Sequence, residues 1–140
     1  MEISEVNPDG NVYQLKDATA RTEIAQIRAQ DSYSTTEVQT TRKWIDNKPI
    51  YRKVVSVGAL PNNGAKTVSH GISDLDFFVS VEGVAYNPTT ATYIPLSNPG
   101  TGGSTVQLAI VGSNIRISTN YNATVSTICY VILMYTKSTD

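Results

Sequence analysis

The chain has 140 residues and a formal net charge of −1, from 11 basic and 12 acidic side chains. Charged residues make up 16% of the sequence, against roughly 25% in an average soluble protein. Because nucleic acids and anionic membranes are bound through clustered Lys and Arg, this composition argues against both kinds of partner. A chain of this length can bury roughly two-thirds of the surface of its unfolded form, which is enough for a domain with a hydrophobic core.

The cysteine content and the hydropathy pattern indicate which kinds of protein this chain can be. Cys129 is the one cysteine, so no internal disulfide can form. It lies in the apolar run Ile128–Met134, where a buried small side chain is expected. The chain shows no apolar stretch near 18 residues and no charged-then-apolar signal segment at its start. We therefore expect no membrane insertion and no secretion, with release from a cell by lysis.

Residues 1–16 are predicted to be an attachment segment. Asn7-Pro8-Asp9-Gly10 suits a type I turn, and short apolar segments on both sides can pair as a hairpin. A two-stranded hairpin is marginal in water on its own. We therefore expect residues 1–16 to dock on a neighbouring chain or on an upstream partner.

Residues 17–32 are predicted to form an oligomerisation stem, with a helix capped by Asp17 that ends by about Asp31. Ala20, Ile24 and Ile27 recur at spacings of four and three, which places them on one narrow coiled-coil stripe. A lone helix of about 14 residues is marginal in water, so another surface must cover the stripe. Isoleucine at both core positions favours three or four helices. The alternative is a helix that packs on its own β-domain.

Residues 33–140 are predicted to form a head domain of about eight strands, as an antiparallel β-sandwich or jelly roll. Asp46-Asn47-Lys48 and Gly112-Ser113 are expected hairpin turns. The last strand is apolar on both faces, so it is either central in the sheet or sealed by a neighbouring subunit. Apolar and polar residues alternate strictly over 77–82, which predicts a half-buried strand. Residues 86–105 are expected to form a long loop that contains one short strand, 92–96. The strands are expected at 41–45, 49–57, 66–70, 77–82, 92–96, 106–111, 114–119 and 127–135.

The sequence offers little for catalysis. His70 is the only histidine, and successive side chains of a strand point to opposite faces, so Ser69, His70 and Asp74 are a poor triad. A structural histidine is the favoured interpretation. Asp74 and Asp76 suit turn capping better than a calcium site or a glycosidase pair. We therefore expect no catalytic residues, no metal site and no cofactor, in a protein that is not an enzyme.

A binding surface remains as the candidate site. Tyrosine offers a flat apolar face for sugar C–H groups together with a hydroxyl, and asparagine offers a paired donor and acceptor. The candidate ligand-binding residues, all in or beside predicted loops, are Tyr86, Asn87, Tyr93, Asn98, Asn120, Tyr121 and Asn122. The alternative interpretation is that they are turn and rim-packing residues.

Two stretches resemble a known family. Tyr13–Arg21 (YQLKDATAR) resembles the linker and helix of tail-fibre and baseplate proteins from phages and prophages of Gram-positive gut bacteria. Trp44–Lys53 (WIDNKPIYRK), followed by Gly58–Pro61 (GALP) and His70–Ile72 (HGI), resembles the small head domain that often follows. With the ending Tyr135–Lys137 (YTK), the resemblance covers most of residues 12–137. One departure is Asn47, where the family pattern has glycine; asparagine can also adopt the left-handed conformation.

The resemblance implies a homotrimer with a helical stem and three β-rich heads, whose outer surface meets the host cell. It also implies a protein made in the bacterial cytoplasm, carried on the virion and joined to an upstream fibre or baseplate protein. We therefore expect a receptor-binding head that recognises a host-surface glycan, although the resemblance reaches no receptor-binding residue set. The alternatives are a purely structural head-fibre or decoration protein of the virion, and a monomeric carbohydrate-binding module. A depolymerase ranks last, because the chain lacks convergent carboxylates.

Overall fold

The computed structural model describes residues 18–100 and 102–140. The chain divides into two compact units, Met1–Ser32 and Tyr33–Asp140. Within the described ranges, no helix has the length and apolar character that a membrane span requires.

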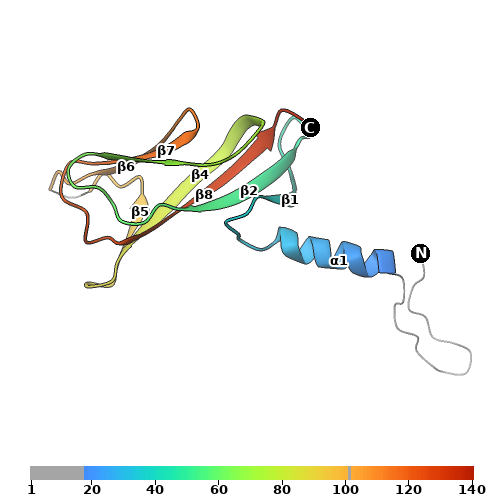
Figure 1. The fold of residues 1–140 in the computed structure, drawn as a ribbon, viewed down its shortest axis with the longest axis horizontal. Coiled ribbons are helices and arrows are strands. Elements are labelled where there is room, and N and C mark those ends of the chain that lie inside the picture. The colour runs from blue at the N-terminus through green and yellow to red at the C-terminus, as the bar shows by residue number, and fades with distance from the viewer. Residues whose placement is uncertain (1–17, 101) are drawn as a thin grey trace, which may run out of the picture. The chain divides into compact units, whose positions relative to one another are not determined.

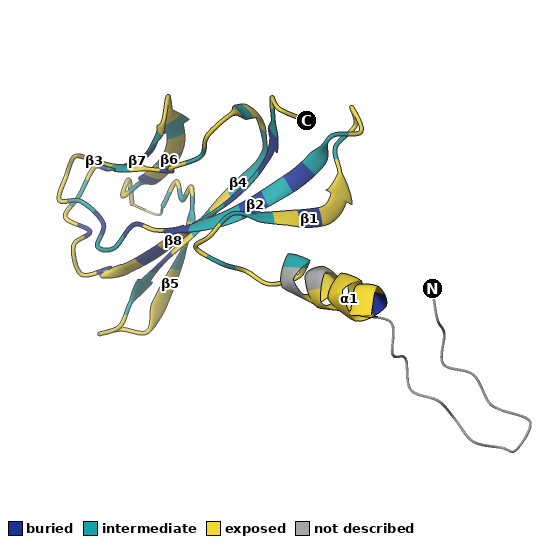
Figure 2. Cartoon of the chain, turned by 45° about the vertical axis from the view of Figure 1, so that its right-hand side comes forward, coloured by how far each residue is buried: buried dark blue, intermediate teal, exposed yellow. Residues whose placement is uncertain are grey.

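In the first unit, helix α1 (Ala18–Gln30) occupies the segment that the sequence predicts as helical. Arg28 lies in its last turn, where a positive charge suits the helix dipole. Figure 2 shows α1 mostly as exposed surface: Ile24 and Ile27 are 43% and 51% exposed, whereas Ala20 is buried. The predicted cap Asp17 and the predicted hairpin of residues 1–16 lie outside the described residues.

The described residues of the second unit form two antiparallel sheets (Figure 1). The larger sheet has the order β1 (Val38–Lys43), β2 (Pro49–Ser56), β8 (Ile128–Lys137), β4 (Leu75–Asn87) and β5 (Thr92–Leu96). The smaller sheet has the order β3 (Ala65–Ser69), β7 (Asn114–Thr119) and β6 (Val106–Val111). The protein is therefore mainly β with antiparallel sheets and a short helix, as the sequence predicts.

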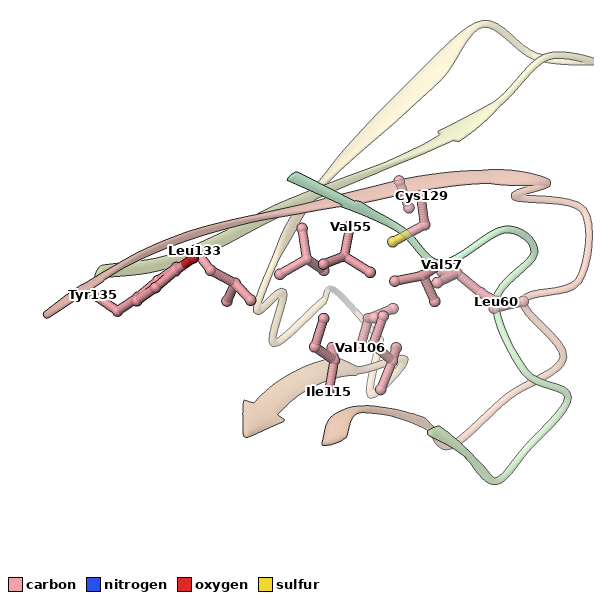
Figure 3. Close-up of a cluster of buried hydrophobic side chains, with 12 residues drawn as sticks. Val55, Val57, Leu60, Val106, Ile115, Cys129, Leu133 and Tyr135 are labelled. Carbon is pink, nitrogen blue, oxygen red and sulfur yellow. The ribbon is translucent and has the colours of Figure 1, made fainter. Parts of the chain in front are cut away.

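A hydrophobic core lies between the two sheets (Figure 3). Val55 of β2 and Leu133 of β8 enter it from the larger sheet, and Val106 of β6 and Ile115 of β7 enter it from the smaller sheet. Leu60, in the loop between β2 and β3, is also buried there. Because both sheets contribute apolar side chains to the same cluster, the inner face of each sheet shields that of the other from water.

β8 is the central strand of the larger sheet, which is one of the two positions that its apolar sequence allowed. Its inward residues Cys129, Val131, Leu133 and Tyr135 are fully buried. Ile128 and Tyr130, on the opposite side of the strand, are 41% and 44% exposed. Ile128 and Tyr130 are therefore largely open to solvent on the side of β8 that faces away from the core, as far as the described residues are concerned.

Two predicted strand segments need correction. β1 begins earlier than expected, at Val38, and Trp44 belongs to the turn, where its N–H donates to the carbonyl of Lys48 at 2.9 Å. In β4 the register shifts between Phe78 and Ser80, so an additional residue enters the strand there. Strict alternation over residues 77–82 is therefore wrong: Phe78 and Val81 both pack on the core, three positions apart.

The predicted turns are formed as expected. Asn47 adopts φ 68° and Gly112 adopts φ 59°, so asparagine supplies the left-handed residue where the family pattern has glycine. The predicted long loop over 86–105 is wrong in its first part. Tyr86 and Asn87 continue β4 and pair with Tyr93 and Thr92 of β5.

Candidate functional site

An exposed pair of tyrosines lies near the tip of the β4–β5 hairpin. Tyr86 and Tyr93 are direct cross-strand partners, with ring centroids 4.5 Å apart and a 32° angle between the ring planes. Tyr93 is 68% exposed and Tyr86 is half-buried. Asn87 shapes the turn that follows, because its Oδ1 accepts a hydrogen bond from the N–H of Thr89 at 3.0 Å. The hairpin therefore holds an aromatic surface open to solvent.

Asn98 and Asn120 hold the loop between β5 and β6. The Oδ1 atom of Asn98 accepts the N–H of Gly100 at 3.0 Å, and its backbone pairs with Val106 in both directions. The Oδ1 atom of Asn120 accepts the N–H of Thr105 at 2.7 Å, while its amide nitrogen donates to the carbonyl of Gly103. These contacts are the turn and loop chemistry that the alternative interpretation expected of them.

Tyr121 and Asn122 also have structural contacts. Tyr121 is partly buried against the core, and its carbonyl accepts the N–H of Asn63 at 2.8 Å. The Oδ1 atom of Asn122 accepts hydrogen bonds from the N–H and the hydroxyl of Thr124. The seven candidate residues therefore lie in three separate places: the β4–β5 hairpin, the loop between β5 and β6, and the segment that follows β7. Of these places, the β4–β5 hairpin is the one that carries an exposed tyrosine ring, that of Tyr93.

The larger sheet extends the tyrosine pair into a wider apolar surface that sequence reasoning did not assign to a site. Ile128 of β8 lies directly opposite Tyr86. Two residues further along each strand, on the same side of the sheet, Tyr130 lies opposite Val84. All three of these neighbours are at least 36% exposed. The signal for this surface was present in the sequence as the two-sided apolar character of residues 127–135.

A second exposed aromatic cluster lies at the turn between β1 and β2. The rings of Trp44 and Phe77 stack with centroids 6.1 Å apart, and Ile45 in the turn is 89% exposed. Beside them Lys48 Nζ lies 2.9 Å from Asp76 Oδ2. The Lys48 ammonium and the Thr136 hydroxyl both bond Asp76, which lowers the pKa of that carboxyl, and the Asp76 hydrogen bond raises the pKa of Lys48.

His70 has a structural role, as the sequence predicts. Its Nδ1 accepts the N–H of Ile72 at 3.1 Å, so Nε2 carries the proton and donates to the carbonyl of Gly112 at 3.2 Å. The ring edge also contacts Phe78, with ring centroids 5.7 Å apart. The buried imidazole therefore links the end of β3 to the β6–β7 turn. Among the described residues, no group of three or more His, Cys, Asp or Glu side chains is placed to hold a metal ion.

Cys129 is a fully buried residue of β8, in agreement with the sequence prediction of a small hydrophobic side chain. Burial raises the pKa of its thiol to about 11, an effect that Lys66 partly offsets. The reactive thiolate is therefore scarce at neutral pH, and the side chain serves packing.

Comparison with known proteins finds no matching family model, no similar curated protein and no similar solved structure.

Proposed function

We propose that this protein is the head of a trimeric phage tail fibre, which binds the surface of the host cell through a glycan. The structural observation that supports the proposal is the exposed Tyr86–Tyr93 pair. The sequence resemblance over most of residues 12–137 supports the phage assignment, in which residues 1–16 join an upstream fibre or baseplate protein on the virion.

The tyrosine pair has the properties that a sugar-binding surface needs. An aromatic ring binds the apolar C–H face of a sugar, and its hydroxyl can bond the sugar oxygens. Tyr93 is 68% exposed, and its ring packs against Tyr86 at a centroid distance of 4.5 Å. Because this packing restricts the ring before a ligand arrives, less side-chain entropy is lost on binding.

The two exposed isoleucines of α1 support a trimeric state. Ile24 and Ile27 are 43% and 51% exposed, and isoleucine at coiled-coil core positions favours assemblies larger than a dimer. Three heads on one stem would display three copies of each sugar site. The avidity of such a trimer exceeds the affinity of one site without any additional contact.

A purely structural role in the virion is the second candidate, and a separate observation favours it. Asn98, Asn120, Tyr121 and Asn122 are engaged in turn and core contacts, so much of the predicted ligand surface serves the fold. In this role the head would decorate the particle without recognising a receptor.

The decisive experiment measures binding of the fluorescently labelled protein to a panel of Gram-positive gut bacteria and to an array of their purified wall polysaccharides. Light scattering coupled to size exclusion gives the oligomer mass of the same sample. The proposal expects a mass near three times 15.2 kDa and binding to at least one strain. A trimer that binds no strain and no polysaccharide supports the structural role, and a monomer that binds polysaccharide supports a carbohydrate-binding module.

A further inference from the structure

The two sheets differ in the chemistry of the sides that face away from the core. On the smaller sheet, Thr67 of β3 pairs with Arg116 of β7, and Gln107 of β6 pairs with Ser118 of β7. Thr67, Arg116 and Gln107 are exposed. This is the usual pattern of an antiparallel sheet with one side in the core and one side in water.

The centre of the outward side of the larger sheet is apolar instead. Ile128, Tyr130 and Ile132 alternate along β8 with the buried residues of the core. Tyr130 lies opposite Val84 of β4, and Ile132 lies opposite Val54 of β2. These five residues, Val54, Val84, Ile128, Tyr130 and Ile132, are called the outer patch below. They extend across three adjacent strands at the centre of the sheet.

Charged side chains on the same side lie at the margin of the outer patch. Glu82 of β4 pairs with Ile132, beyond the point where β5 ends its pairing at Gly83, so Glu82 lies at an edge of the sheet. Arg52 is only 9% exposed, and its guanidinium lies 4.4 Å from the centroid of the Tyr33 ring. The centre of the patch is therefore free of exposed charge.

The exposure of the surface suits a protein partner. Val84, Ile128 and Tyr130 of the outer patch are 36%, 41% and 44% exposed, and the adjoining Tyr93 is 68% exposed. A contiguous exposed apolar surface often marks a protein interaction site. A stable protein interface buries about 800 Å² from each partner, with an apolar centre and a polar rim. The outer patch supplies such a centre, and Glu82 and Ser56, both exposed, belong to its rim.

We propose that the outer patch is the surface through which the heads of two copies of this chain meet, within the assembly that the proposed function requires. An uncharged patch can contact copies of itself without bringing like charges together. Helix α1 exposes a second apolar surface, at Ile24 and Ile27, in a different unit of the same chain.

This interface places the sugar site at a subunit boundary. Tyr86 lies directly opposite Ile128 of the outer patch, and Tyr93 lies on the edge strand β5. A neighbouring head seated on the patch would form one wall of a cleft beside the tyrosine pair. The heads would also hold each other independently of the helical stem.

The test compares Tyr130→Arg with Gln107→Arg in the full chain. Gln107 is exposed on β6 opposite Ser118, on the outward side of the smaller sheet, so an arginine there meets no like charge across the strand pair and serves as a matched control. Light scattering over a dilution series should show Tyr130→Arg dissociating at a protein concentration at least about tenfold higher than the parent, because an unpaired charge would be buried. Gln107→Arg should match the parent. Equal dissociation of the two variants overturns the proposal.

A second measurement keeps the proposal falsifiable if Tyr130→Arg fails to fold. The photo-crosslinking residue benzoylphenylalanine preserves an aromatic ring at position 130, and it can be placed at position 107 as the control. Illumination should give covalent dimers from position 130 and not from position 107; absence of dimers from position 130 overturns the proposal.

Cell binding separates this proposal from the proposed function. If Tyr130→Arg abolishes cell binding while the oligomer mass stays that of the parent, the outer patch is a ligand site and the interface is overturned. If the parent protein binds no cells but crosslinks at position 130, the interface stands and the receptor-binding function falls.

Discussion

Tyr86 and Tyr93 are direct cross-strand partners with ring centroids 4.5 Å apart, yet Tyr93 is 68% exposed and Tyr86 is half-buried. The two rings therefore differ in what they offer. Tyr86 supports the pair on the sheet, and Tyr93 presents its face to solvent. A substitution at Tyr93 should change binding more than it changes stability.

Tyr93→Ala should reduce binding to host cells at least about tenfold, because each trimer loses an aromatic contact at three sites together. The lost ring contact should lower stability by only about 0.5–1.5 kcal/mol. Cell binding and the melting temperature check the two expectations. Tyr121→Ala provides the contrast. Because Tyr121 packs on the core, its substitution should lower the melting temperature more than Tyr93→Ala does. Unchanged cell binding by Tyr93→Ala would place the receptor surface elsewhere.

Ile24→Asp combined with Ile27→Asp should weaken assembly, because each isoleucine buried in a stem contributes roughly 1.5–3 kcal/mol. Both residues are substantially exposed on α1, so the folded head should keep its melting temperature. Thr22→Asp, at an exposed position of the same helix, is the control. A concentration series in light scattering measures the effect. A mass indistinguishable from the parent at every concentration would mean that the heads alone hold the assembly.

His70→Ala should destabilise the head by about 1–3 kcal/mol, because the side chain itself is buried and two partly buried hydrogen bonds lose their partner. The affected groups are the N–H of Ile72 and the carbonyl of Gly112. Urea unfolding gives the free energy, and Ser69→Ala at the exposed neighbouring position should change it by less than about 0.5 kcal/mol. Cell binding should persist at temperatures where the variant is folded. An effect of His70→Ala no larger than that of Ser69→Ala would contradict this structural role.

Asp76→Asn should lower stability at neutral pH and lose this effect in acid. Lys48 and Thr136 lower the pKa of Asp76 in the folded chain. A carboxyl with a lowered folded-state pKa stabilises the fold above its unfolded pKa of about 4, and this contribution disappears as the pH falls through the lower folded value.

Melting temperatures of the parent and of Asp76→Asn, measured from pH 7 to pH 2, should show the difference between the two proteins disappear as the pH falls. Lys48→Met should reproduce the loss at neutral pH, and the double variant should add little, because Lys48 Nζ and Asp76 Oδ2 contact each other at 2.9 Å. A stability difference that stays constant down to pH 2 would show that ionisation of Asp76 is not its cause.

Elements with local causes were predictable from the sequence. The hairpin of β6 and β7 occupies the residues expected of it, because alternating apolar side chains flank a turn in which Gly112 adopts φ 59°. Helix α1 follows from an alanine-rich segment, and Asn47 supplies the left-handed residue of the turn between β1 and β2. In each case the residues that determine the element are within a few positions of one another.

Features with distant causes were decided by the tertiary structure. β8 pairs with β2 and β4, which precede it by tens of residues, and only this pairing shows which side of the strand is buried and which side is exposed. The bulge near Phe78 changes the face of the following residues, and a period-two pattern contains no sign of it. The ligand candidates behave likewise. In sequence, Asn120 and Tyr93 are both polar or aromatic residues in or beside predicted loops. In the structure, the Asn120 amide is engaged in hydrogen bonds with a distant loop, whereas the ring of Tyr93 stays open to solvent. Side-chain type is a local property, whereas exposure depends on which distant strand covers the residue.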